Sequence, residues 1–167
     1  MKHRGYQQGN VPPGRKRSEA QPTAATAAPP ADLAAWREAL RPVIEGGQYE
    51  RLVSLADALG QELRDQKVTT SQVRQVFGEL RRIELRWHEG APQADAAWAR
   101  SRLLMLKPLM AYQVARAGDR EKRQGLQRLK DALDAGVELA GADRERFARL
   151  MDFFEAALAY HRYYGGK

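Results

Sequence analysis

The sequence predicts an all-α protein, a compact bundle of five or six helices with the C-terminal helix at its centre. Apolar residues recur at three- to four-residue intervals through most of the chain after residue 31. Valine, isoleucine and threonine are sparse and rarely alternate with polar residues, so no segment is typical of a strand. Short connections that contain glycine separate the helical segments, which favours antiparallel neighbours.

The composition indicates one folded domain, residues 32–167, preceded by a tail. The chain has 167 residues, of which 43% are hydrophobic, and a net charge of +7. No apolar run approaches the roughly 18 residues of a membrane span, and residues 1–30 lack the apolar core of a signal peptide. We therefore expect a cytoplasmic protein without a membrane partner. The absence of cysteine excludes disulfides and thiolate chemistry.

Residues 1–31 are expected to form a disordered basic tail. Five prolines lie there among Gly, Gln, Ala and Thr, with few large apolar side chains to bury. The tail holds five Lys or Arg against one Glu, which is more than half of the net charge. The cluster Arg15–Arg17 could hold phosphate loosely, but the composition favours a solubilising segment. Overall charge therefore does not identify a binding surface on the domain.

The first three helices are expected at residues 32–44, 49–65 and 69–88. Gly46–Gly47 separates the first two. Thr69 and Gln72 fit a capping box at the start of the third, because each side chain can bond the backbone N–H of the other residue. The third helix has a single apolar stripe, made of Val73, Val76, Phe77, Leu80, Ile83 and Trp87.

The next two helices are expected at residues 92–117 and 120–139. The middle of the fourth, residues 103–110, is nearly all apolar, which predicts burial on two sides. Pro108 removes an N–H within this stretch and should kink the helix. Asp119 is the candidate N-cap of the fifth helix.

The last helix, residues 144–164, is predicted to be the central helix of the bundle, with the other helices packed around it. Its apolar surface covers more than half of its circumference, so it must be buried on several sides. Asp143 is the candidate N-cap, and Gly165–Gly166 can end the helix in the left-handed conformation.

No pattern indicates a metal site or a cofactor site. His3, His88 and His161 form no i,i+4 pair and no HExxH motif. Arg82 and His88 resemble the loose Arg-x5-His signature of helical HEPN ribonucleases, although Ile83 stands where a polar residue is usual. A metal-independent ribonuclease is therefore kept as an alternative function.

The arginines of the third helix are more informative. Arg74 and Arg81 fall on one flank of its apolar stripe, in a sector without an acid. Seven residues of helix separate them by about 10 Å, enough for each guanidinium to bind a separate phosphate. Gly78 between them would let a backbone approach closely. The alternative interpretation is an ordinary solvated surface, as we expect for Arg82.

Three segments resemble, in order, the motifs of one family. Residues 67–77, KVTTSQVRQVF, are similar to its LT-x-SQ-(I/V)-R element, and residues 107–116, KPLMAYQVAR, to its L-K-P-x-x-A-Y-x-x-(G/A)-R element. Residues 153–166, FFEAALAYHRYYGG, are similar to its C-terminal F-x-E-A-(I/L/V)-(V/L)-A-Y-H-(K/R)-(F/Y)-Y-G-G element. The family is the small subunit of the type III-A CRISPR effector, the Csm complex. The first sixty residues show no match.

The resemblance implies a non-catalytic helical protein that stacks in several copies, as a filament along the guide RNA–target RNA duplex, in antiviral defence. It also implies contacts with the large polymerase-like subunit and the backbone subunits, which carry out the cleavage reactions. The basic members of the matched motifs are implied to bind RNA, and the helical wheel adds Arg81. The predicted RNA-binding residues are therefore Lys67, Arg74, Arg81, Lys107 and Arg116. A basic protein-interaction bundle without a nucleic-acid role is the remaining alternative.

Overall fold

The computed structural model describes residues 28–167, and these residues form six helices and no strand. The helices are α1 (Leu33–Ile44), α2 (Tyr49–Asp65), α3 (Thr70–Arg86), α4 (Gln93–Ala115), α5 (Arg120–Ala140) and α6 (Arg144–Tyr163). The all-α prediction is confirmed, and each helix begins and ends within two residues of the expected position. The predicted tail up to residue 27, including Arg15–Arg17, lies outside the described residues, as does His3.

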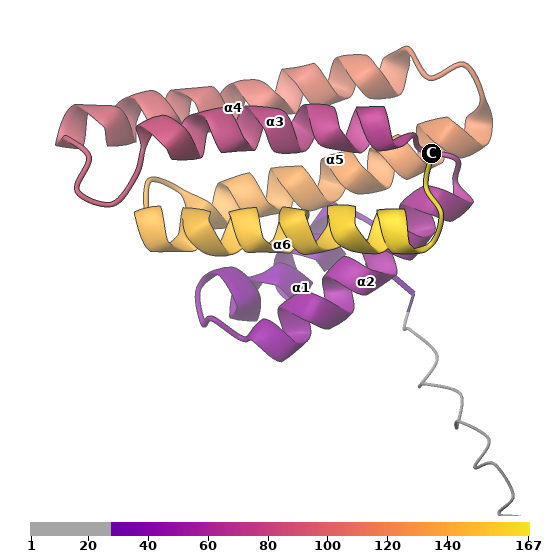
Figure 1. Ribbon diagram of the computed structural model, residues 1–167, viewed down its shortest axis with the longest axis horizontal. Helices are drawn as coiled ribbons and strands as arrows, with labels where there is room; N and C mark the ends of the chain where they lie inside the picture. The colour runs from indigo at the N-terminus through magenta and orange to yellow at the C-terminus, as the bar shows by residue number, and fades with distance from the viewer. Residues whose placement is uncertain (1–27) are drawn as a thin grey trace, which may run out of the picture.

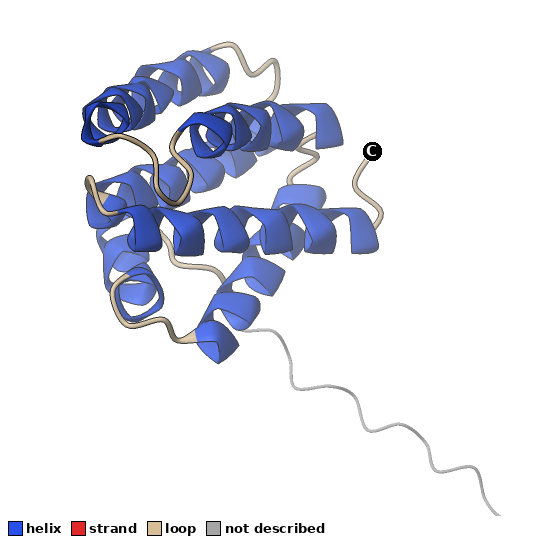
Figure 2. Ribbon diagram, turned by 60° about the vertical axis from the view of Figure 1, so that its left-hand side comes forward, coloured by secondary structure: helices blue, strands red, loops and turns tan. Residues whose placement is uncertain are grey.

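The helices are arranged in three layers of two. α3 and α4 form one outer layer, α1 and α2 form the other, and α5 and α6 lie between them (Figures 1 and 2). α6 packs against α1, α2, α3 and α5, which confirms its predicted central place. α5 shares the centre, because it packs against α1, α2, α4 and α6.

Small residues allow the two central helices to approach their neighbours closely. A Cβ added to Gly60 of α2 would lie 2.7 Å from the backbone nitrogen of His161 and 2.9 Å from the carbonyl oxygen of Ala157, both on α6. A Cβ added to Gly136 of α5 would lie 2.3 Å from Cδ1 of Leu150. These glycines therefore set the distances between helices in the core.

α4 is buried on one face only, so the expectation of burial on two sides is wrong. Leu103 and Met110 are fully buried, whereas Leu104 is 41% and Met105 60% exposed. The reason is that α4 lies at the edge of the bundle, where it packs against α3 and α5. The helix continues through Pro108 as a single element.

The local signals at the helix starts are confirmed. The side chain of Thr69 accepts a hydrogen bond from the backbone N–H of Gln72, and the Gln72 side chain accepts one from the Thr69 N–H. Asp119 and Asp143 accept from the third residue of their helices. Each such cap contributes about 1 kcal/mol.

The C-terminal segment folds back onto the start of α3. The N–H of Thr70 donates to the carbonyl oxygen of Lys167 at 2.7 Å, and the Thr70 hydroxyl donates to that of Gly166 at 3.0 Å. His161 is fully buried, with Nε2 2.8 Å from the carbonyl oxygen of Val68. Burial lowers the pKa of His161, so the neutral ring donates through Nε2. This segment holds the turn between α2 and α3 in place.

Candidate nucleic-acid interface

Lys67 lies in the turn between α2 and α3 and has an unusual backbone. Its φ of 58° is the only positive value at a non-glycine residue in the described part of the chain. The N–H of Lys67 donates to the carbonyl of Arg64 and that of Val68 to Leu63, which are the two bonds of a Schellman motif. Glycine usually fills this position because it lacks a Cβ. The Lys67 side chain is exposed, and Nζ lies 2.5 Å from Oε2 of Glu121.

Arg74 and Arg81 are both exposed on α3 but differ in their partners. Arg81 forms an ion pair with Glu84, so the expectation of an acid-free sector is wrong. Arg74 has no ion pair or hydrogen bond within residues 28–167. Gly78, between the two arginines, faces open space, since a Cβ added there would have no neighbour within 4 Å. Arg74 is therefore the member of this pair that is available to an external anion.

The Lys107 side chain forms an ion pair within the protein. Its Nζ donates to Oε1 of Glu138 on α5 at 2.8 Å, while Nε of Arg37 on α1 donates to Oε2 at 3.0 Å. Burial alone would raise the pKa of Glu138, but the hydrogen bonds from Lys107 and Arg37 outweigh it and hold the pKa below its usual value. Lys107 thus belongs to a half-buried network that joins α1, α4 and α5.

Arg116 follows the last turn of α4 and is exposed. Its Nη1 donates to Oη of Tyr112 at 3.3 Å, and its guanidinium lies 5.3 Å from the centre of the Tyr112 ring. No carboxylate of the described residues pairs with it. It lines a hollow of about 370 Å³ between α3 and α4 in which no side chain is acidic. The polar members of that lining are Gln72, Gln75, Tyr112, Gln113, Arg116 and Lys122.

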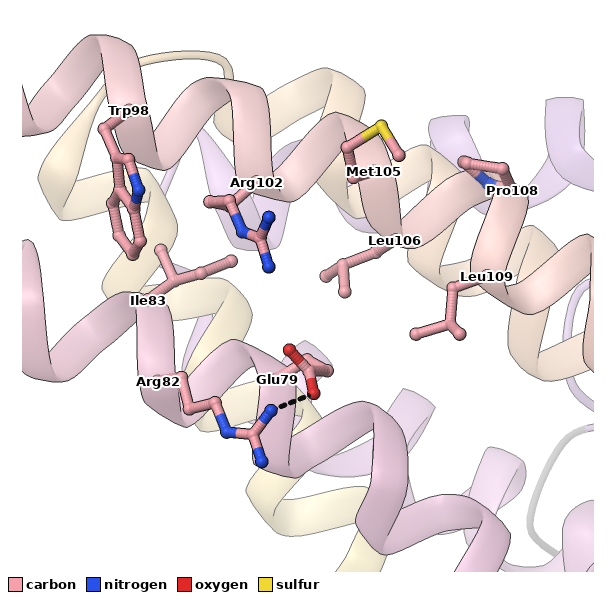
Figure 3. Close-up of a pocket in the computed structure, with 9 residues that line it drawn as sticks. All are labelled: Glu79, Arg82, Ile83, Trp98, Arg102, Met105, Leu106, Pro108 and Leu109. Carbon is pink, nitrogen blue, oxygen red and sulfur yellow. Dashed lines mark hydrogen bonds and ion pairs between the residues drawn. The ribbon is translucent and has the colours of Figure 1, made fainter.

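A second hollow of about 500 Å³ adjoins the first, because Leu109 lines both. Figure 3 shows it between α3 and α4, with Arg102 pointing from α4 toward α3. Arg102 has no ion pair within the described residues, whereas Arg82 pairs with Glu79 at 2.5 Å. Together the hollows form one groove along α3 and α4, which we call the α3–α4 groove.

Arg102 is not among the predicted residues, although the sequence carries a signal for it. Arg102, Leu109 and Arg116 are spaced seven residues apart on α4 and therefore share one flank of that helix. All three line the α3–α4 groove.

The structure does not gather the five predicted residues into one site. Arg116 lines the α3–α4 groove, and Lys107 pairs with α5 instead. Lys67, Arg81 and Lys107 each pair with a carboxylate, whereas Arg74 and Arg116 pair with none in residues 28–167. Their contact with RNA stays a prediction.

The arrangement of Arg82 and His88 gives no support to a ribonuclease centre. His88 lies beyond the end of α3, where its Nδ1 is 2.7 Å from the carbonyl oxygen of Glu89. Arg82 lines the α3–α4 groove, but His88 does not. Within residues 28–167, no group of three or more His, Asp or Glu side chains could hold a metal ion. No helix of that part combines the length and the apolar character needed to cross a bilayer.

Comparison with known protein families identified a family that matches most of the chain. The family model described as Csm2 Type III-A matches residues 46–167, which include α2 to α6 and all five predicted RNA-binding residues. The match thus extends beyond the three sequence motifs, through α2, so the expectation that the first sixty residues show no match is wrong for residues 46–60. Comparisons with curated proteins and with solved structures found no significant match.

Proposed function

Because the chain belongs to the Csm2 type III-A family, the small subunits of the type III-A CRISPR complex, we propose that it is a non-catalytic RNA-binding scaffold. Several copies stack as a filament along the guide RNA–target RNA duplex in the cytoplasm. The large polymerase-like subunit and the backbone subunits of the complex are its other partners. The observation that carries this proposal is the family match over residues 46–167.

A scaffold that follows any guide sequence must not read bases. Contacts to phosphate and sugar position a protein without specifying sequence. Arg74 and Arg116 suit this role because both are exposed and neither pairs with a carboxylate in the part of the chain that the structure describes. The neutral amides of Gln72 and Gln75, which line the same hollow as Arg116, can donate further hydrogen bonds to phosphate or ribose oxygens.

A few such contacts give weak binding by a single copy. Neutralising about three or four single-strand phosphates corresponds to a slope of roughly −2 to −3 in a plot of log affinity against log salt. Repetition along the filament then supplies the affinity, because a bound neighbour raises the effective concentration of the next copy. The isolated protein should therefore bind RNA weakly and without sequence preference.

The double variant Arg74→Ala/Arg116→Ala tests this role. We expect an unchanged circular dichroism spectrum and weaker assembly of the guide-loaded complex, measured by co-purification of the subunits with guide RNA. Arg41→Ala/Arg64→Ala is the matched control, because it removes the same charge from two exposed arginines of α1 and α2 that pair with carboxylates away from the groove. Equal assembly of the wild type and the first variant would contradict the proposal.

Two simple assays test the alternatives. Purified protein incubated with labelled RNA in the absence of metal should leave the RNA intact. Cleavage that disappears in His88→Ala would favour the ribonuclease. A titration that detects no RNA binding at low salt would favour the protein-interaction bundle.

A further inference from the structure

A further hollow, of about 380 Å³, lies on a different side of α4 from the α3–α4 groove. Val114 of α4 and Ala31, which precedes α1, line it, and the rest of its lining comes from α5. We call it the α5 hollow. It shares no lining residue with the α3–α4 groove. Gln113 of the groove and Val114 of the hollow are consecutive on α4, so their side chains point about 100° apart. The residues from α5 are Arg120, Arg123, Gln124, Gln127, Arg128 and Asp131.

Three arginines of the α5 hollow have no carboxylate partner among the described residues. The side chains of Arg120 and Arg128 form no ion pair and no hydrogen bond there. The Arg123 guanidinium donates to the carbonyl oxygen of Ala117 at 3.2 Å. Arg120 and Arg128 are eight residues apart, or about 12 Å along the helix. Each can therefore bind a separate phosphate.

Asp131 and Gln127 supply hydrogen-bond acceptors to the same hollow. Asp131 is the single acid among the residues that line it, and its side chain is largely buried, with 9% of the residue exposed. Oδ1 of Asp131 accepts a hydrogen bond from Nε2 of Gln127 at 2.7 Å. The remaining oxygens of the two side chains can accept from hydroxyl groups, which RNA carries at the 2′ position. The hollow thus combines cations for phosphate with acceptors for ribose.

The basic N-terminal segment of the chain joins the domain at this hollow. Residues 1–30 hold five Lys or Arg against one Glu, and Ala31 follows them directly. The segment and the hollow therefore attract the same polyanion. A strand can contact both, whereas a small anion cannot. Residues 1–45 also lie outside the part of the chain that matches the family, so this surface is built partly from sequence beyond the match.

We propose that the α5 hollow binds single-stranded RNA, separately from the α3–α4 groove, with the N-terminal segment as a second contact to the same strand. A hollow of about 380 Å³ is near the lower limit of ligand sites. It therefore admits one nucleotide of a flexible strand and excludes a duplex. This ligand differs from the guide RNA–target RNA duplex of the proposed function.

Photo-crosslinking locates the site on the full-length protein. The probe is a short single-stranded RNA that contains 4-thiouridine, and the crosslinked peptides are identified by mass spectrometry. We expect a crosslink within residues 120–131 that persists in Arg74→Ala/Arg116→Ala. It should be lost in Arg120→Ala/Arg128→Ala, while crosslinks to the α3–α4 groove remain and show that this variant is folded. Unlabelled single strand should compete at residues 120–131, and an equal amount of RNA duplex should not.

Four outcomes would overturn the inference. The first is no crosslink within residues 120–131. The second is a crosslink there that disappears in Arg74→Ala/Arg116→Ala, because it would belong to the strand in the groove. The third is equal competition by the duplex, and the fourth is displacement of the probe by ATP at the same phosphate concentration, which would indicate a site for free nucleotides. A crosslink within residues 120–131 with none in the groove would instead reject the groove of the proposed function and retain this site.

The salt dependence of single-strand binding gives a second measurement. Adding Arg120→Ala/Arg128→Ala to Arg74→Ala/Arg116→Ala should make the log–log slope shallower by a further 1.4 or so, because each lost contact removes about 0.7. Arg51→Ala/Arg162→Ala in the same background is the matched control. Both of its arginines are exposed, lack an ion pair within residues 28–167 and line none of the three hollows. Equal changes of slope in the two variants would show that general charge, not the hollow, holds the strand.

Neutralising the cluster at residues 15–17 tests the second contact. Arg15→Gln/Lys16→Gln/Arg17→Gln in the full chain should weaken single-strand binding, because three cations are lost. The crosslink within residues 120–131 should remain. Unchanged single-strand affinity in this variant would contradict the part assigned to the N-terminal segment.

Discussion

The two flanks of α4 use their cations in opposite ways. On the flank toward α5, Lys107 is held by Glu138 in a network that also includes Arg37. On the flank toward α3, Arg116 lines a groove and has no carboxylate partner among the described residues. Both residues belong to one ten-residue motif match and were predicted to bind RNA. The comparison teaches that a half-buried acid on a neighbouring helix can hold a half-buried cation of the motif away from an external partner.

The largest expected effect comes from removing the acid on the α5 flank. Glu138→Leu leaves Lys107 and Arg37 half-buried without their common partner, so we expect a loss of about 2 kcal/mol in the free energy of unfolding. The RNA affinity of this variant should stay within about twofold of the wild-type affinity. Urea denaturation and RNA titration measure the two quantities.

Glu38→Leu is the matched control, because Glu38 pairs with Arg41 at the surface, where both side chains are exposed. Exposed pairs contribute little, so its cost should be below about 1 kcal/mol. Equal losses in the two variants would remove the distinction between the internal network and the surface.

The same network should also appear in the pH dependence of stability. Because the folded protein lowers the pKa of Glu138 below the ordinary value of 4.5, the network contributes its full stability above that pH. The contribution is lost as the pH falls from 4.5 through the lower folded pKa. Denaturation midpoints between pH 6 and pH 3 should therefore fall more steeply for the wild type than for Glu138→Gln. Parallel curves would show that the network does not lower the pKa of Glu138.

Lys67→Gly separates stability from binding at the turn. Glycine adopts the positive φ of this position more easily than lysine does. We expect Tm to rise by roughly 2–4 °C while RNA affinity falls, because the ammonium is lost. Lys67→Arg, which retains both the charge and the strain, should change neither. A higher Tm with unchanged RNA affinity would remove Lys67 from the proposed interface.

The smallest expected effect is at Gly78, on the exposed side of α3. Gly78→Ala should raise stability by about 0.5–1 kcal/mol, because alanine favours the helix and meets no neighbour. If the RNA backbone passes beside Arg74, the added methyl group should also weaken RNA binding. Full RNA affinity in a stabilised Gly78→Ala protein would show that the backbone does not come close there.

The sequence predicted the fold well because its signals are local. Helix bounds, the caps at Thr69, Asp119 and Asp143 and the central place of α6 follow from periodicity and from side chains a few residues apart. The burial of α5 was harder to predict, since it depends on small residues such as Gly136 that carry little hydrophobic signal.

The candidate site was less predictable because ion pairing depends on tertiary contacts. Lys107 and Glu138 are 31 residues apart in the chain, and no spacing rule joins them. The i,i+3 pair of Arg81 with Glu84 was the exception, since this neighbour could have been identified from helical spacing alone.

The salt dependence of RNA binding tests the central claim most directly. Affinities of the full chain for two RNAs of unrelated sequence are measured from low to moderate salt. We predict equal affinities, a log–log slope of roughly −2 to −3, and a slope shallower by about 1.4 in Arg74→Ala/Arg116→Ala, since each lost phosphate contact removes about 0.7. An unchanged slope in the double variant, or a tenfold preference for one RNA, would contradict the account.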